Sequence, residues 1–161
     1  MANKPIAIYL NDHLAGSVTA LQILDSLLKR QTGTTLERAL AELRSEIADD
    51  RRELEILMAR LHIPESSTRK TAAWFSEKLY ELKAQVDDPS GQLFLLEALD
   101  TLSIGIEGKA LLWKALDAAA KSVHALQGME YDYLIQRAAA QRNLVEKMRL
   151  RAARSALANG T

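Results

Sequence analysis

Leucine and isoleucine recur every three or four residues along most of this chain, which is the spacing that places apolar side chains on one face of an α-helix. The clearest stretch runs from Thr34 to about His62, with a predicted seam of Leu36, Leu40, Leu43, Ile47, Asp50, Leu54, Leu57 and Leu61. Seven of these eight residues are aliphatic, and the exception is Asp50. Burying an unpaired carboxylate costs several kcal/mol, so the pattern predicts a polar partner for Asp50 inside the fold.

Helix-capping and helix-breaking residues divide the chain into segments that all have the pattern of helices, and no segment alternates like a strand. Gly33 is a typical left-handed stop, and Thr34-Thr35-Leu36-Glu37 has the form of a capping box. Asp88-Pro89 resembles a cap followed by proline at the first helical position. The predicted helices are about Pro5–Arg30, Thr34–His62, Thr68–Val86, Asp88–Lys121 and Glu130–Leu157.

The short helix predicted from Thr68 to Val86 is about as long as a bundle, because about 19 residues at 1.5 Å each span roughly 28 Å. Two antiparallel hairpins joined by such an end-to-end crossover resemble the ferritin-like superfamily, and the resemblance extends from Pro5 to Leu157. It implies an all-α, ferritin-like four-helix bundle with a helical crossover between the two hairpins. We expect residues 1–161 to form this single domain.

Ferritin-like bundles hold a metal pair with one Glu from each of two helices and a Glu-x-x-His motif from each of the other two. This chain has no Glu-x-x-His motif, and its nearest counterparts are Asp50-x-x-Glu53, Glu46-x-x-Asp49 and Glu130-x-x-Tyr133. One interpretation of the interior is therefore a divergent metal site for iron, manganese or zinc. Its ligands would be His13, Asp50, Glu53 and Glu107.

The second interpretation is a buried polar layer, because each long helix carries a polar residue near the middle of the bundle. Equal heights in an antiparallel hairpin place His13 within about one turn of Asp50, and Lys109 and Gln141 interrupt the apolar seams of the last two long helices. A lysine repels a metal cation but neutralises a carboxylate. We therefore favour a structural layer without a cofactor, and keep a metal site and a small-molecule site as alternatives. The predicted layer consists of His13, Asp50, Glu107, Lys109 and Gln141.

The charge balance and composition of the chain argue against several classes of function. The chain has 21 Lys plus Arg and 21 Asp plus Glu, so we expect no nucleic-acid partner. It has no cysteine, which excludes thiol catalysis and cysteine-ligated metal. It also lacks the continuous apolar run of a signal peptide or a membrane span, so we expect a cytoplasmic protein without a membrane partner.

Two features of the chain are best explained by packing between helices or between subunits. The segment from Leu93 to Ile106 is apolar nearly all round its axis, which favours burial on several sides or a homodimer. Trp74 and Phe75 would dock the crossover on the bundle, and Gly105 and Gly108 would allow close helix approach or mark a kink.

We expect a non-catalytic binding or structural module whose ligand is unknown. The alternative is a metal-dependent oxidoreductase or metal-storage protein that uses iron or manganese.

Overall fold

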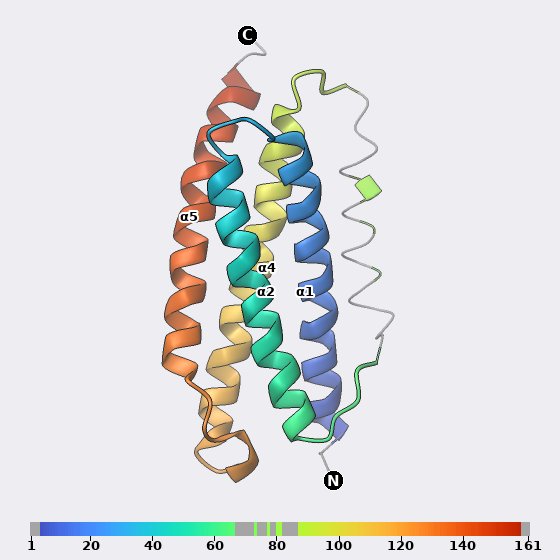
Figure 1. The fold of residues 1–161 in the computed structure, drawn as a ribbon, viewed down its shortest axis with the longest axis vertical. Helices are drawn as coiled ribbons and strands as arrows, with labels where there is room; N and C mark the ends of the chain where they lie inside the picture. The colour runs from blue at the N-terminus through green and yellow to red at the C-terminus, as the bar shows by residue number, and fades with distance from the viewer. Residues whose placement is uncertain (1–3, 67–72, 74–76, 78–79, 82–86, 159–161) are drawn as a thin grey trace.

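The protein is a four-helix bundle (Figure 1). The computed structural model describes residues 4–66, 73, 77, 80, 81 and 87–158. Its elements, in chain order, are α1 (Lys4–Arg30), α2 (Glu37–Arg60), α4 (Gln92–Ala120), the short 3-10 helix η1 (His124–Leu126) and α5 (Tyr131–Ala158). No strand occurs in this part of the chain. The sequence pattern therefore predicted the all-α class and the four long helices.

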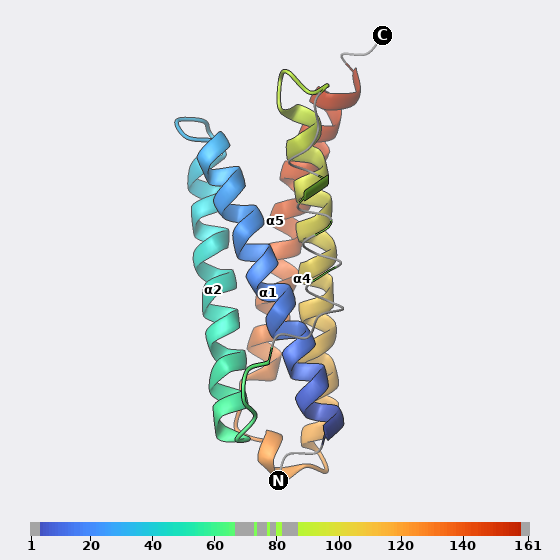
Figure 2. The same ribbon diagram turned by 90° about the vertical axis from the view of Figure 1, so that its right-hand side faces the viewer.

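The helices form two antiparallel hairpins, α1 with α2 and α4 with α5. The helix α2 ends at the end of the bundle that holds the N-terminus, whereas α4 begins at the opposite end (Figures 1 and 2). The described ends of the chain that connects the hairpins therefore lie at opposite ends of the bundle. The helix predicted for Thr68–Val86, with Trp74 and Phe75, lies outside the described residues except at positions 73, 77, 80 and 81, which are helical. Among those that are described, no helix combines the length and apolar composition needed to cross a bilayer.

The turn between α1 and α2 has the predicted glycine but not the predicted capping box. Gly33 has φ +78°, a backbone conformation that glycine adopts without steric cost. The helix begins at Glu37, and its N-cap Leu36 has no side-chain cap hydrogen bond, so Glu37 is at the first helical position and not at the third, as a capping box requires. The Gly33 amide donates to Glu37 Oε2 at 2.7 Å, and the Leu36 amide donates to Thr34 Oγ1 at 3.3 Å, so these side chains fix the turn before the helix.

The start of α4 differs from the prediction by about three residues. Pro89 does not occupy the first helical position, because a turn intervenes and the helix begins at Gln92, after Gly91 with φ +70°. The N-cap is therefore Gly91 and not the predicted Asp88. Asp88 still binds the start of the helix, since its Oδ2 accepts a hydrogen bond of 2.8 Å from the Phe94 amide.

A buried asparagine fixes the chain after α2 to α1. Asn11 donates to the carbonyl oxygens of Ala7 and Pro64 at 2.9 and 3.2 Å, and its Oδ1 accepts from the Ser66 amide at 2.7 Å. The side chain of Asn11 thus joins two segments that are far apart in sequence.

Two apolar clusters form the core, one toward each end of the bundle. The first cluster includes Leu24, Leu43, Ile47, Leu99 and Ile106, and the second includes Leu10, Leu54, Leu57, Leu112 and Trp113. On α2 the boundary between them falls between Ile47 and Leu54, and Asp50 lies in this interval. On α4 it falls between Ala110 and Leu112, one turn of helix or less from Lys109. The buried carboxylate therefore lies where the two hydrophobic cores meet.

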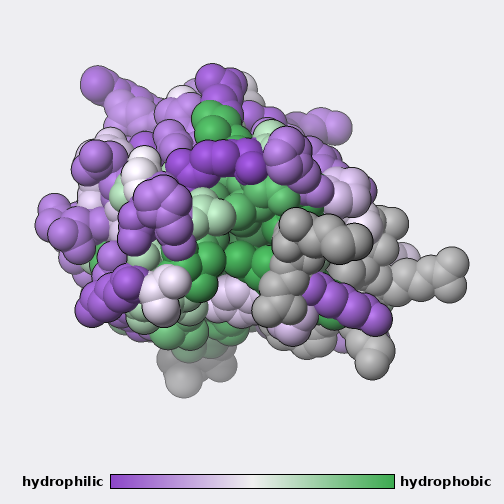
Figure 3. Space-filling model, turned by 90° about the horizontal axis from the view of Figure 1, so that it is seen from below, coloured by the Kyte–Doolittle hydropathy of each residue, from purple (hydrophilic) through white to green (hydrophobic). Residues whose placement is uncertain are grey.

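The surface of the bundle carries both hydrophobic and hydrophilic residues. Seen from the end of the bundle that holds the N-terminus, it has a hydrophobic centre surrounded by hydrophilic residues (Figure 3). On α4, which has buried residues on several sides, Ile104 and Leu111 are 59% and 53% exposed. These side chains are available to a second copy of the chain, and the homodimer stays a prediction.

Candidate functional site

Asp50 of α2 is the centre of a network of charged and polar side chains inside the bundle. Its side chain is only 1% exposed. Its Oδ1 accepts hydrogen bonds of 2.8 and 2.5 Å from Nε and Nη2 of Arg137, on α5. Its Oδ2 accepts one of 3.0 Å from Gln141 Nε2 and another from Lys109 Nζ. Both carboxylate oxygens are therefore occupied by donors from the second hairpin.

Further hydrogen bonds of Lys109 and Gln141 extend the network beyond Asp50. Lys109 Nζ also donates to Gln141 Oε1, and Gln141 Nε2 donates to Glu46 Oε2 at 3.0 Å. The Arg137 guanidinium lies 5.1 Å from the centre of the Tyr133 ring, within cation–π range. Lys109 and Arg137 carry two positive charges, and Asp50 and Glu46 carry two negative charges. The network as a whole is thus neutral, which is the condition for holding a carboxylate in a dry interior.

Burial affects the pKa values of the two cationic side chains in this network. It lowers the pKa of Lys109, and attraction to Asp50 opposes this effect. Burial also acts to lower the pKa of Arg137, but the contacts with Asp50 outweigh it and the pKa is raised. Removing the Asp50 carboxylate would leave Lys109 with the unfavourable effect of burial and without its main counter-charge.

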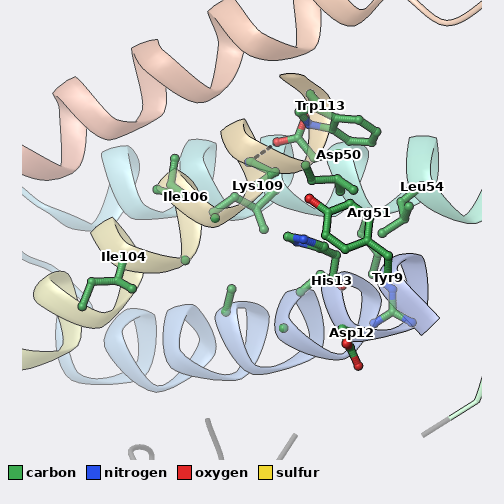
Figure 4. Close-up of a pocket in the computed structure, with 17 residues that line it drawn as sticks. Tyr9, Asp12, His13, Asp50, Arg51, Leu54, Ile104, Ile106, Lys109 and Trp113 are labelled. Carbon is green, nitrogen blue, oxygen red and sulfur yellow. Dashed lines mark hydrogen bonds and ion pairs between the residues drawn. The ribbon is translucent and has the colours of Figure 1, made fainter. Parts of the chain in front are cut away.

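A cavity of about 380 Å³ lies beside the network, between α1, α2 and α4 (Figure 4). Asp50 and Lys109 form part of its wall, and Ile47, Leu54, Ile106 and Leu112 provide apolar surface. On α1 its wall is made by small residues at Gly16, Ser17 and Ala20, and on α4 by Gly105 and Gly108. Small side chains at the level where the two cores separate therefore leave space between the helices.

The two glycines of α4 do not serve close helix packing. A Cβ atom added to Gly105 or to Gly108 would meet no heavy atom within 4 Å. The expectation that they allow a neighbouring helix to approach is therefore wrong, because the space beside them is open and belongs to the cavity wall.

His13 extends from α1 into the cavity, on the side opposite Lys109 and Asp50 (Figure 4). Its ring packs edge-on against Tyr9, with ring centres 4.7 Å apart and planes at 77°. Burial lowers the pKa of His13, although Asp12 opposes the shift. His13 is therefore a neutral imidazole at neutral pH.

Trp113 adds an unusual feature to the cavity wall. Its side chain is buried, yet its indole Nε1–H has no hydrogen-bond partner among the described residues. A buried donor without a partner costs about 1–3 kcal/mol, and such groups are uncommon in folded proteins. Trp113 lines the same cavity as His13 and Lys109.

Comparison of the chain with protein families, with curated proteins and with solved structures found no significant match. The site is therefore interpreted from its own geometry.

The structure brings together some of the predicted site residues and separates others. Asp50, Lys109 and Gln141 are in direct contact, and His13 lies across the cavity from the first two. Glu107 lies outside this group: its side chain is 40% exposed and pairs with Arg142 at 2.9 Å. The reason is helix geometry, because two residues correspond to about 200° of rotation and place Glu107 on nearly the opposite side of α4 from Lys109.

The four residues proposed as metal ligands do not form one cluster. His13 and Asp50 line the cavity, whereas Glu53 and Glu107 do not. Within the described ranges, no group of three or more His, Asp or Glu side chains could hold a metal ion. Lys109 and Arg137 occupy the positions beside Asp50 that a cation would need.

Sequence reasoning missed three residues of the site. Arg137 and Glu46 enter the network from the edges of α5 and α2, each one turn before a predicted member, Gln141 and Asp50. This spacing of four residues was the available signal. Trp113 was assigned only to an apolar seam, and nothing in the sequence shows that its N–H lacks a partner.

Proposed function

We propose that this protein is a non-catalytic binding module that holds a small, mostly apolar molecule in the cavity between α1, α2 and α4. Ligand sites are commonly clefts of about 300–1,000 Å³ with apolar walls and a few placed polar groups. The cavity of about 380 Å³ has this character, with His13, Asp50, Lys109 and Trp113 among its apolar neighbours. The observation that carries the proposal is the cavity itself, whose largely apolar wall brings these few polar groups together.

The polar network has a supporting role in this proposal. A carboxylate has about four lone-pair sites, and Asp50 accepts four hydrogen bonds from Lys109, Arg137 and Gln141. It therefore has no free position for proton transfer or metal binding in this arrangement. Its contacts hold the two hairpins at a fixed register beside the cavity, which favours binding over catalysis.

The proposal includes a ferritin-like origin for the bundle. Its support is the helix order, with two antiparallel hairpins in which α2 ends and α4 begins at opposite ends of the bundle. In this proposal the metal-binding interior of such bundles is replaced by a neutral polar network and a cavity. Elemental analysis of protein purified without chelator tests that part, and stoichiometric iron or manganese lost in Asp50→Ala would refute it.

Indole NMR tests binding directly. In a Trp74→Phe variant labelled with nitrogen-15, the single indole N–H signal belongs to Trp113. Titration with acetylnaphthalene, a neutral two-ring ketone, should move this signal and raise the melting temperature.

Two cavity-filling variants test whether the ligand occupies this cavity, and a third variant is the matched control. Gly105→Leu and Gly108→Leu add side chains to the cavity wall at positions where a Cβ atom meets no heavy atom within 4 Å. They should weaken binding strongly, whereas Ala41→Leu, on an exposed position of α2, should not. If no member of a neutral two-ring series moves the Trp113 signal at its solubility limit, the proposed function is wrong.

A further inference from the structure

We propose that the cavity holds a single unbranched hydrocarbon chain of about ten to twelve carbons, which lies along the bundle with its polar head group beside His13. This inference rests on the proposed function and specifies the class of ligand. It follows from the length of the cavity, from its volume and from the different chemistry of its two ends.

The cavity is elongated, because the residues of its wall recur along one face of each helix. On α4 the wall runs from Ile104 to Trp113, and on α2 it runs from Ile47 to Leu54. On α1 the wall residues have the spacing of one helix face and are Tyr9, Asp12, His13, Gly16, Ser17 and Ala20. At 1.5 Å per residue, the stretches on α1, α4 and α2 are about 16, 13 and 10 Å long. The enclosed space therefore runs parallel to the helices.

The volume of the cavity corresponds to one chain of this length. An apolar cavity of about 150 Å³ accommodates benzene, which is about 25 Å³ for each carbon atom. At the same density the present cavity, at about 380 Å³, holds about 15 carbon atoms. An extended chain advances about 1.2 Å per bond, so a single file of about 12 carbons covers the length of the wall on α4. Because the two counts are close, the cavity is little wider than one chain.

The two ends of the cavity differ in polarity. The end nearer the α1–α2 turn is formed by Ala20, Ile47 and Ile104, whose side chains carry no polar atoms. The opposite end holds Tyr9 and His13, whose hydroxyl and imidazole groups donate or accept hydrogen bonds (Figure 4). A ligand with an apolar tail at the first end and a polar head at the second end matches both.

The charged groups in the middle of the cavity wall are held by the network. Lys109 Nζ donates to Asp50 and to Gln141, and Asp50 also binds Arg137. Gln141 and Arg137 belong to α5, which contributes no residue to the described wall. These contacts draw the ammonium group toward α5, and the methylene groups of Lys109 remain for contact with an apolar tail.

Two further charged residues lie at the polar end of the cavity. Arg51 pairs with Glu55 at 2.6 Å, and Asp12 points away from the centre of the cavity (Figure 4). The head group is therefore placed against Tyr9 and His13.

A series of unbranched methyl ketones measures the length of the site. Calorimetry would give the dissociation constants of the ketones with eight, ten, twelve and fourteen carbons. We expect the affinity to rise about fourfold for each added CH₂ group up to about twelve carbons and not to rise further at fourteen. A rise that continues at fourteen carbons with the same slope would overturn the inferred length.

Acetyldecalin separates shape from size, because this two-ring methyl ketone also has twelve carbons. It should bind about tenfold more weakly than the unbranched ketone of twelve carbons, since a body wider than one chain forces the wall apart. Equal affinity of the two ketones would overturn the inference of an unbranched chain.

Gly105→Leu tests the position of the tail. Gly105 lies beside Ile104 in the cavity wall, and a Cβ atom added there meets no heavy atom within 4 Å. The added side chain shortens the apolar end, so it should weaken the ketone of twelve carbons at least about tenfold more than the ketone of eight carbons. Ala118→Leu, at an exposed position of the same helix, should change neither. An equal loss for the whole series in Gly105→Leu would overturn this placement of the tail.

Nuclear Overhauser effects between ligand and protein locate the head group. The acetyl methyl group of the bound ketone should contact the His13 ring, and the methyl group at the other end of the chain should contact Ile47 or Ile104. Contacts of the acetyl methyl group with Ile47 or Ile104, or with Lys109 in place of His13, would overturn the orientation.

The outcomes separate this inference from the proposed function. If no ketone binds, whether unbranched or cyclic, the binding function itself is wrong. If the ketones bind but their affinity does not depend on chain length, the protein is a binding module and the inference of an unbranched chain is wrong.

Discussion

Replacing Asp50 with alanine removes the carboxylate that Lys109 and Arg137 share. Both cationic side chains are only 15% exposed in the intact bundle, so loss of the carboxylate leaves them largely buried without the counter-charge that they share. The variant also leaves a void of several atoms between the two hydrophobic cores. The expected result is a large loss of stability from uncompensated positive charge.

The magnitude follows from the geometry of the network. Removing one partner of a buried ion pair costs about 3–5 kcal/mol, and here two cations lose the same counter-charge. Gln141 and Glu46 remain as acceptors and keep the loss within this range. With a urea m-value of about 2 kcal/mol per molar for a chain of this size, the unfolding midpoint should fall by about 1.5–2.5 M.

Urea titration followed by far-UV circular dichroism measures this change. Asp25→Ala is the control, because Asp25 of α1 also forms an ion pair with an arginine, Arg44 of α2, but at the surface. It should cost less than about 1 kcal/mol. Asp50→Asn keeps the shape of the side chain and should fall between the two. Equal effects of Asp50→Ala and Asp25→Ala would refute the view that Asp50 is a buried counter-ion.

A combined variant separates charge from packing. Replacing Asp50, Lys109 and Arg137 together with leucine or methionine removes every member of the two ion pairs at Asp50. Such replacements are often neutral or stabilising, so the triple variant should be more stable than Asp50→Ala. A triple variant less stable than Asp50→Ala would show that packing, and not stranded charge, causes the loss.

Three further predictions concern other parts of the bundle. Burial lowers the pKa of His13 from 6.5, so protonation favours the unfolded chain and stability should fall as the pH drops below this value, by at most about 1.4 kcal/mol per pH unit. Urea titrations across this range should show a flatter profile for His13→Gln than for the unaltered protein. Asn11→Ala should remove hydrogen-exchange protection from the Ser66 amide, and retained protection would contradict the role of Asn11 as a tether. Tyr131→Phe should lower the free energy of unfolding by about 1–2 kcal/mol, because the buried hydroxyl donates to the Leu126 carbonyl oxygen at 2.7 Å; an unchanged urea midpoint would refute this.

Much of the fold was predictable because helical periodicity and capping are local properties. The apolar seams located all four described long helices, and the single carboxylate in one seam identified Asp50 as buried. Lys109 and Gln141 interrupt their own seams in the same way, and the register of two antiparallel hairpins placed them at a similar height. These three residues do contact one another.

The rest of the site depends on distances between helices, which a sequence does not contain. Arg137 lies on the edge of its helix, and only the spacing of α2 and α5 lets its long side chain reach Asp50. Glu107 is close to Lys109 in sequence but points to a different interface, where Arg142 binds it. The cavity arises because Gly105 and Gly108 face open space instead of a packed neighbour, a difference that depends on helix placement alone.

The charge balance around Asp50 limits which mutations this gene can accumulate. Two cations and two carboxylates are joined through Gln141, so a mutation that alters one of them is selected against until a compensating mutation appears in another. These positions should therefore be inherited as a set: descendants either keep all of them or replace the group with apolar residues. The other residues that face the cavity are under no such constraint, so ligand preference can drift while the bundle that carries it is preserved.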